Sequence, residues 1–176
     1  GPDDARNMAK NGTAVVPTLS VGCYLAMNCG PYGNPDHPDY KFFQEMLNRY
    51  VPAQIERCTV PEVRHTYIGF RDWLNQEMPE RKMPWVGTVY PDRVHGFAKH
   101  ARESFRNFQE AGAKVGVGSD GGTGITFIGQ LGVEFEAYQR FGYSPAQTLR
   151  MATLGNMEIL KLDDELGSIE PGKYAD

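Results

Sequence analysis

The sequence has no long apolar run and no long basic stretch. A membrane-spanning helix needs about 20 consecutive apolar residues, whereas the mean hydropathy of this chain is −0.48. Its 18 basic residues are outnumbered by 22 acidic ones, which gives a net charge of −4. We therefore expect neither a membrane nor a nucleic acid as a partner.

Cysteine is scarce, and the first residues lack the features of a signal peptide. The three cysteines are Cys23, Cys29 and Cys58. Their odd number and their spacing do not match a closed zinc site or a disulfide framework. No basic region followed by an apolar one opens the chain. With 40% hydrophobic residues among 176, the composition is typical of a soluble globular protein with reduced thiols.

Two short apolar segments are predicted to form buried strands. The first covers residues 13–19, with Pro17 near its end because proline cannot donate to a strand ladder. The second covers residues 114–119 and leads into a glycine-rich turn. Neither alternates with polar residues, which is typical of parallel strands buried on both faces.

Helical patterns flank and separate these strands. The clearest covers residues 92–111, where apolar residues recur at intervals of three and four until Gly112 ends the pattern. Further helices are predicted at residues 3–10, 41–50, 127–141, from residue 61 and from residue 144. This alternation predicts an α/β fold. Since two strands cannot form a sheet buried on both faces, we expect the chain to be a piece of a larger sheet.

Asp120 is the first candidate for chemistry. It follows the second predicted strand, at the end where α/β folds place ligands and catalytic groups. The neighbouring Gly121 and Gly122 leave room for a metal ion or a substrate. A carboxylate there can bind a divalent cation or accept a proton from water. The alternative is a turn in which Asp120 caps the next helix.

The same glycine-rich segment, residues 115–124, also allows a phosphate-binding interpretation. It lacks the G-x-x-x-x-G-K-[ST] pattern, and its Gly-x-Gly lies inside the predicted strand. The carboxylate of Asp120 would repel a phosphate. A nucleotide-binding α/β domain is therefore the less favoured alternative.

The histidines and aromatic residues have structural interpretations. The histidines are His37, His65, His95 and His100, and they form no H-x-H or H-E-x-x-H pair. We interpret them as surface or packing residues. Tyr67, Phe70 and Trp73 are predicted to form a buried helix face, with a lid over a pocket as the alternative.

Residues 112–122, Gly-Ala-Lys-Val-Gly-Val-Gly-Ser-Asp-Gly-Gly, resemble the last barrel strand of the metal-dependent amidohydrolase superfamily, in its imidazolonepropionase and prolidase-like branch. The resemblance extends to residues 4–19, 144–153 and 162–176. It implies a (β/α)8 TIM-like barrel beside a small β-sandwich domain. Residues 1–162 would be the C-terminal part of that barrel, with its last two strands, their helices and a helical insertion at about residues 22–90. Residues 163–176 would begin the return to the small β domain.

The resemblance also implies a chemistry. In this family the aspartate after the eighth strand binds a metal ion and acts as a general base, and Asp120 is the matching residue. The implied cofactor is a divalent metal, with zinc favoured, as one or two ions. The implied reaction is hydrolysis of a carbon–nitrogen bond in an amide, cyclic amide or dipeptide, so the substrate would be a small or peptide-like molecule that approaches past Gly121 and Gly122.

The other metal ligands of the family have no counterpart in this sequence. A whole barrel needs about 250 residues, so we expect the chain to need the missing N-terminal barrel half and to be inactive by itself. A non-catalytic half-barrel that serves only in association is the alternative, and a homo-oligomer is compatible with either interpretation.

Overall fold

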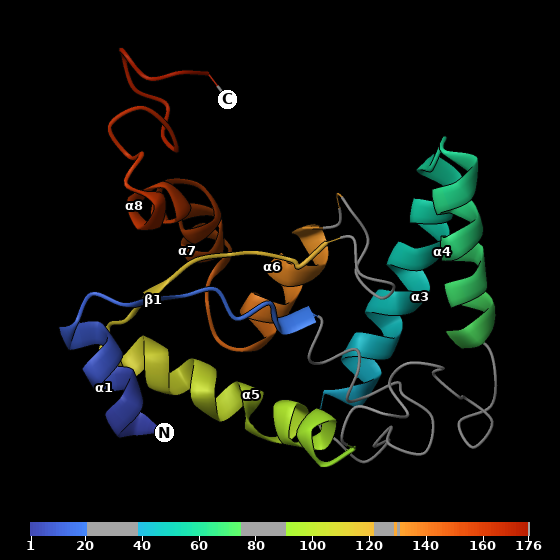
Figure 1. Ribbon diagram of the computed structural model, residues 1–176, viewed down its shortest axis with the longest axis horizontal. Coiled ribbons are helices and arrows are strands. Elements are labelled where there is room, and N and C mark those ends of the chain that lie inside the picture. Colours follow the sequence, from blue (N-terminus) through green and yellow to red (C-terminus); the bar gives the residue numbers. More distant parts are fainter. Residues whose placement is uncertain (21–38, 75–90, 122–128, 130, 176) are drawn as a thin grey trace. The chain divides into compact units, whose positions relative to one another are not determined.

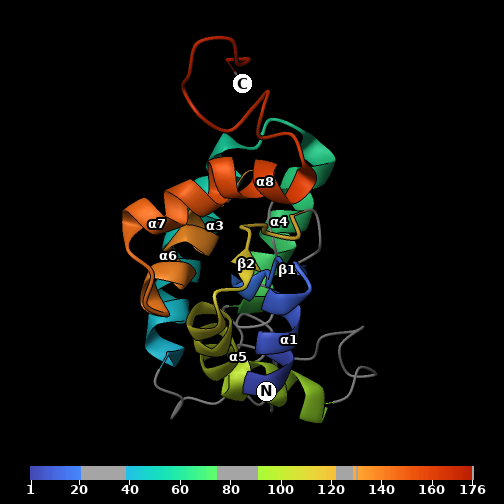
Figure 2. The same ribbon diagram turned by 90° about the vertical axis from the view of Figure 1, so that its left-hand side faces the viewer.

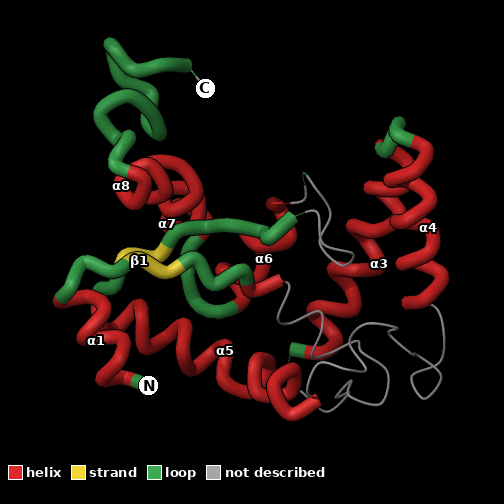
Figure 3. The backbone as a smooth tube through the Cα atoms, viewed as in Figure 1, coloured by secondary structure: helices red, strands yellow, loops and turns green. Residues whose placement is uncertain are grey.

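The computed structural model describes residues 1–20, 39–74, 91–121, 129 and 131–175. The chain divides into two compact units, which are described separately. The first unit comprises Gly1–Leu19, Arg102–Ser119 and Glu134–Asp176, and the second comprises Ser20–Ala101 and Asp120–Val133. Most of the described residues are helical, as the tube in Figure 3 shows.

The first unit contains a small parallel sheet. Strand β1 (Ala14–Val15) pairs with strand β2 (Lys114–Val115), and Ala14 lies opposite Lys114. The two strands lie side by side in Figure 2. The predicted parallel pairing of the two segments is confirmed, whereas their ladder is shorter than the predicted strands. The full barrel stays a prediction, because the described residues form this two-stranded sheet and no further strand.

Helices α1 (Pro2–Lys10) and α5 (Pro91–Ala111) lead into the two strands, as Figure 1 shows. Each is followed by a glycine in the left-handed region, Gly12 at φ +66° and Gly112 at φ +67°. Glycine adopts this conformation without the steric cost that a Cβ would bring. Both helices therefore end where the sequence predicts. Helix α6 (Leu131–Arg140) begins later than predicted, and residues 127–128 lie outside the described residues.

A continuous helical run covers residues 145–160 in the first unit. It consists of α7 (Pro145–Arg150), the π-helical turn η3 (Met151–Gly155) and α8 (Asn156–Leu160). At its start, Ser144 Oγ accepts a hydrogen bond from Gln147 N at 3.2 Å, and Gln147 Oε1 accepts one from Ser144 N at 2.8 Å. The predicted capping box is confirmed. The π-helical turn was not predicted.

Residues 161–175 follow this run without a strand. They turn around the ammonium group of Lys173, which donates hydrogen bonds to Asp163 O and Ser168 Oγ, both at 2.6 Å. The backbone N–H of Tyr174 donates to Glu165 O at 2.9 Å. These contacts order the tail locally.

The core of the first unit is a cluster of aromatic rings around Phe105. Phe105 is 1% exposed. Its ring makes edge contacts with Tyr138 at 4.7 Å, Tyr143 at 5.1 Å and Phe141 at 6.0 Å between centroids. Such edge-to-face pairs add to the free energy gained from burial. Through this cluster, α5 packs against α6 and against the turn that precedes α7.

The second unit contains α3 (Tyr40–Arg57) and α4 (Pro61–Leu74), which lie side by side. Helix α3 is longer than predicted because it continues past Pro52. Tyr67 is buried, as predicted, whereas the side chains of Phe70 and Trp73 lie outside the described residues. No helix in the described ranges combines the length and the apolar character that a membrane span requires.

Replacing Phe105 tests the aromatic core. We expect Phe105→Ala to lower the free energy of unfolding by ~3–5 kcal/mol, because it leaves a large cavity among three rings. Urea unfolding of the protein that contains this chain measures the loss. Leu149, which is 56% exposed, provides the control: Leu149→Ala should cost less than about 1 kcal/mol. An equal loss for both variants would show that the Phe105 ring is not a core residue.

Candidate functional site

The candidate site is built on the extended segment that follows β2. The Gly116 N–H donates to Val15 O at 2.9 Å, which continues the pairing with β1 by one bond. At the next residue, the hydrogen-bond partner is the side-chain amide of Asn156. Val117 N donates to Asn156 Oδ1 at 2.9 Å, and Asn156 Nδ2 donates to Val117 O at 2.9 Å. The amide thus satisfies both backbone groups of Val117, as a neighbouring strand would.

Two glycines allow neighbouring side chains to pack closely against this segment. A Cβ on Gly116 would lie 2.5 Å from Asn156 Oδ1, and a Cβ on Gly118 would lie 2.7 Å from Val16 Cγ1. Both distances are too short for any side chain. Packing therefore accounts for the Gly-x-Gly that suggested a phosphate loop.

Tyr138 on α6 satisfies the remaining carbonyl of this segment. Its hydroxyl donates to Gly116 O at 2.6 Å, and its side chain is fully buried. Burial raises the pKa of Tyr138 well above its ordinary value, and the nearby Glu134 carboxylate raises it further. The hydroxyl therefore stays protonated and remains a donor. Glu134 itself is 0% exposed on the same helix.

Asp120 lies three residues beyond Val117 and is exposed. Its backbone is left-handed, with φ +50°. Thr18, which follows β1, is left-handed as well, at φ +44°. Non-glycine residues in this region cost free energy and cluster at functional sites. Each strand segment thus ends in a strained residue, as is typical of the functional end of a parallel sheet.

The glycines expected beside Asp120 are only partly described. Gly121 is exposed, and Gly122 lies outside the described residues together with residues 123–128. That the Asp120 carboxylate faces a cavity, and that these glycines line a substrate path, stay predictions.

The histidines and the cysteine whose side chains are described lie on or beside other helices. His65 on α4 and His100 on α5 are exposed. Cys58 is half-buried after α3, where its thiol donates to Val60 O at 3.6 Å. His37, Cys23, Cys29 and the side chain of His95 lie outside the described residues. Within the described ranges, no three or more His, Cys, Asp or Glu side chains gather into a group that could hold a metal ion.

The sequence interpretation missed Asn156 and Glu134. Both are polar residues inside helical patterns, where a polar side chain is normally assigned to the solvent side. A usable signal for Glu134 is its position four residues before Tyr138, on the helix face that also carries Ala137 and Phe141. For Asn156 no local signal exists, because its partner Val117 is 39 residues away.

Chemically, the described part of the site offers one accessible carboxylate. Carboxylate oxygens suit a divalent metal ion and can also accept a proton. Asp120 therefore fits as one ligand of a metal site, and other ligands would have to come from residues that are not described here.

Comparisons with known proteins point to one family. The family model of the Amidohydrolase family matches residues 55–176. A guanine deaminase of Escherichia coli (strain K12) is 42% identical over 67 residues, which is 36% of this chain. The match spans 15% of the length of that deaminase. No solved structure matches the chain.

Substitution of Asn156 tests its contact with Val117. Asn156→Ala removes both hydrogen bonds to Val117 and the bond that Nδ2 donates to Ala152 O at 3.2 Å, whereas Asn156→Asp loses the two bonds donated by Nδ2 and keeps an acceptor for Val117 N. We expect both variants to lower the free energy of unfolding by ~1–3 kcal/mol. Hydrogen exchange of the Val117 amide should accelerate in Asn156→Ala and stay slow in Asn156→Asp. Asn48→Ala on the exposed face of α3 is the control; unchanged Val117 exchange in Asn156→Ala would contradict the contact.

The raised pKa of Tyr138 predicts a loss of stability in alkali. Above its ordinary value of 10.0, the unfolded chain releases the Tyr138 proton while the folded chain keeps it. The unfolded state then binds fewer protons, so the free energy of unfolding falls as the pH rises. Tyr138→Phe should make this fall less steep between about pH 9 and pH 11 in urea titrations. Tyr174→Phe, at a 70% exposed position, should leave the slope unchanged.

Proposed function

Because this chain belongs to the amidohydrolase family, we propose that it forms part of a hydrolase that cleaves a carbon–nitrogen bond. The observation that carries the proposal is the place of Asp120, an exposed aspartate with a left-handed backbone that lies five residues beyond the parallel strand β2. Active groups of α/β enzymes gather at the carboxyl ends of their strands.

Asp120 would hold a divalent metal ion, with zinc favoured, through its carboxylate. When bound, such an ion lowers the pKa of a water molecule far below its ordinary value, towards about 7, and polarises the bond under attack. The Asp120 carboxylate accepts the proton that the attacking water loses. It can then return that proton to the leaving nitrogen. The adjacent Gly121 leaves the backbone open to the substrate.

The substrate class has two candidates. A small amide, cyclic amide or dipeptide follows from the likeness to the imidazolonepropionase and prolidase-like branch. Deamination of a heterocycle is the second, and the similarity to a guanine deaminase favours it. Both reactions hydrolyse a carbon–nitrogen bond; deamination releases ammonia and leaves a ring carbonyl, whereas hydrolysis of an amide or peptide forms a new carboxyl group.

A complete site requires further protein. The described residues supply one carboxylate and no metal-binding group of three. We propose that the remaining ligands and barrel strands come from an N-terminal barrel half, and that this chain supplies the strand that carries Asp120.

The test is Asp120→Asn in the complete native enzyme. We expect kcat to fall by about 10²–10⁴-fold, because asparagine cannot accept a proton, while the thermal melting curve stays unchanged. Bound metal, measured by atomic emission, should also decrease. Asp164→Asn, at an exposed position outside the site, is the matched control and should keep full activity. Full activity in Asp120→Asn would exclude this role.

One assay distinguishes between the two candidate substrate classes. The wild-type enzyme is offered guanine, a cyclic amide and a dipeptide, and ammonia and new carboxyl groups are measured. Ammonia from guanine would favour the deaminase. A new carboxyl group from the amides would favour the other branch, and no turnover of any of the three would contradict the proposed reaction class.

A further inference from the structure

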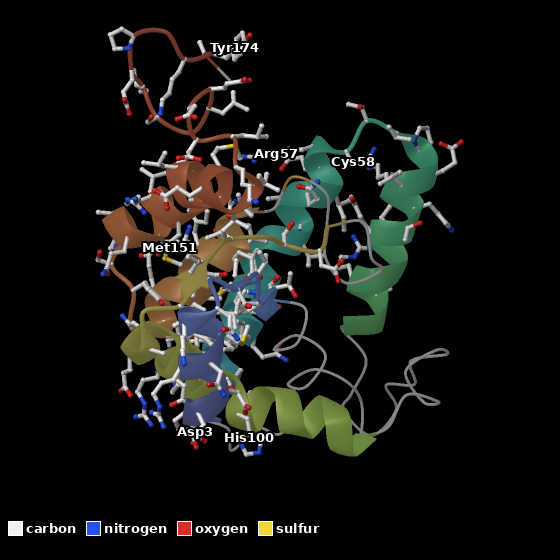
Figure 4. All side chains as sticks on the ribbon, turned by 60° about the vertical axis from the view of Figure 1, so that its left-hand side comes forward. Asp3, Arg57, Cys58, His100, Met151 and Tyr174 are labelled. Atoms are coloured by element: carbon white, nitrogen blue, oxygen red, sulfur yellow. The ribbon has the colours of Figure 1, made fainter. Side chains whose placement is uncertain are left out.

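The first unit contains a cavity of about 350 Å³ that the proposed function does not use. Its walls come from the end of α5, from the first residues of β2 and from the helical run 145–160. Met151, one of the lining residues, is labelled on that run in Figure 4. The size is within the range of about 300–1,000 Å³ that is usual for small-molecule sites.

The cavity lies at the beginning of β2. It is lined by Lys114 and Val115, which are the two residues of that strand, whereas Asp120 follows Val115 by five residues along the chain. Catalytic groups of parallel sheets gather at the other, carboxyl end of the strands. Catalysis at Asp120 therefore does not account for this cavity.

The charged side chains that line the cavity include one more positive charge than negative charge. Arg150 Nη2 and Glu158 Oε1 form an ion pair at 2.7 Å, and both side chains belong to the lining. Lys114 is exposed and makes no ion pair within the described part of the chain. The Lys114 ammonium group thus remains to bind a ligand. A single positive charge favours a ligand with one negative charge over a phosphate with two.

Tyr143 adds a fixed hydrogen-bond donor. It is 9% exposed, and its ring is held at 5.1 Å from Phe105 and 6.1 Å from Tyr138. Burial raises its pKa, so the hydroxyl stays protonated. The hydroxyl makes no hydrogen bond within the described residues, although Tyr143 lines the cavity. Its oxygen is not among the fully buried unpaired atoms of the described residues, so it is open to the cavity, and a ligand there can accept its hydrogen bond.

The rest of the wall is partly apolar. Val115, Met151 and Ile159 line the cavity together with these polar groups. Met151 begins the π-helical turn η3, a feature that is frequent at functional sites. An occupant should therefore carry an apolar body as well as its charge.

We propose that this cavity binds a small organic monocarboxylate at a site separate from Asp120. The carboxylate meets the Lys114 ammonium and the Tyr143 hydroxyl, and the apolar body lies against Met151 and Ile159. Occupation of this site does not depend on the proposed hydrolase activity, because no group of the cavity belongs to the Asp120 segment.

Methyl NMR of the complete native protein tests the site, with labelled methionine and isoleucine. Benzoate is the probe, and benzamide is its neutral control of equal shape. We expect the Met151 and Ile159 methyl signals to shift saturably with benzoate, and at least about tenfold more weakly with benzamide. Inorganic phosphate should not compete. Equal affinity for benzoate and benzamide, or preferential binding of phosphate, would overturn the proposal.

Two variants identify the groups that bind. Lys114→Met should raise the Kd for benzoate by about ten- to a hundredfold, because it removes a charge-assisted hydrogen bond. Tyr143→Phe keeps the ring in the core and should raise the Kd by a smaller factor. Lys10→Met and Tyr174→Phe, both at exposed positions, are the matched controls and should leave it unchanged.

Two further results would count against the site. If Lys114→Met binds benzoate like the wild type, the cavity does not use this cation. If the native protein shows another segment seated against the Met151 methyl group, the cavity is filled by the protein itself. Asp120→Asn should keep the wild-type Kd for benzoate even if it abolishes hydrolysis, so failure of the proposed function and failure of this proposal are distinguishable.

Discussion

The two hydrogen bonds between the Asn156 amide and the backbone of Val117 are the contact on which the first unit depends. Strand β2 has a backbone partner in β1 on one side. Beyond the short ladder, side chains from α8 and α6 make the hydrogen bonds to the backbone that a further strand would otherwise make. Because buried backbone groups must find partners, the position of the helical run 145–160 and the absence of a side chain at Gly116 both follow from this contact.

The same constraint shapes the segment that leads to Asp120. Val117 is held at both its N–H and its C=O, and only two residues separate it from Asp120. The left-handed backbone of Asp120 is uncommon outside glycine, although aspartate adopts it more readily than most residues. Strain of this kind persists where the surrounding structure holds the chain in place, and in a family of hydrolases it marks Asp120 as the residue to test first.

The two ends of β2 carry different chemistry. Its carboxyl end leads to an acidic residue that suits a metal ion and a proton. Its beginning lies at a cavity with one surplus positive charge and a buried tyrosine. The residues that line the cavity and the segment that leads to Asp120 share no side chain.

The sequence by itself determined the local features of this protein. Gly12, Gly112 and the Ser144 capping box act within a few residues, so helix ends could be read from them. The motifs at residues 112–122, 144–153 and 162–176 together were enough to identify the family. The contact of Asn156 with Val117, the burial of Glu134 and the cavity beside Lys114 were decided by tertiary structure. These depend on residues that are distant in the chain, and local patterns of hydrophobicity carry no information about which distant partners a polar side chain will meet.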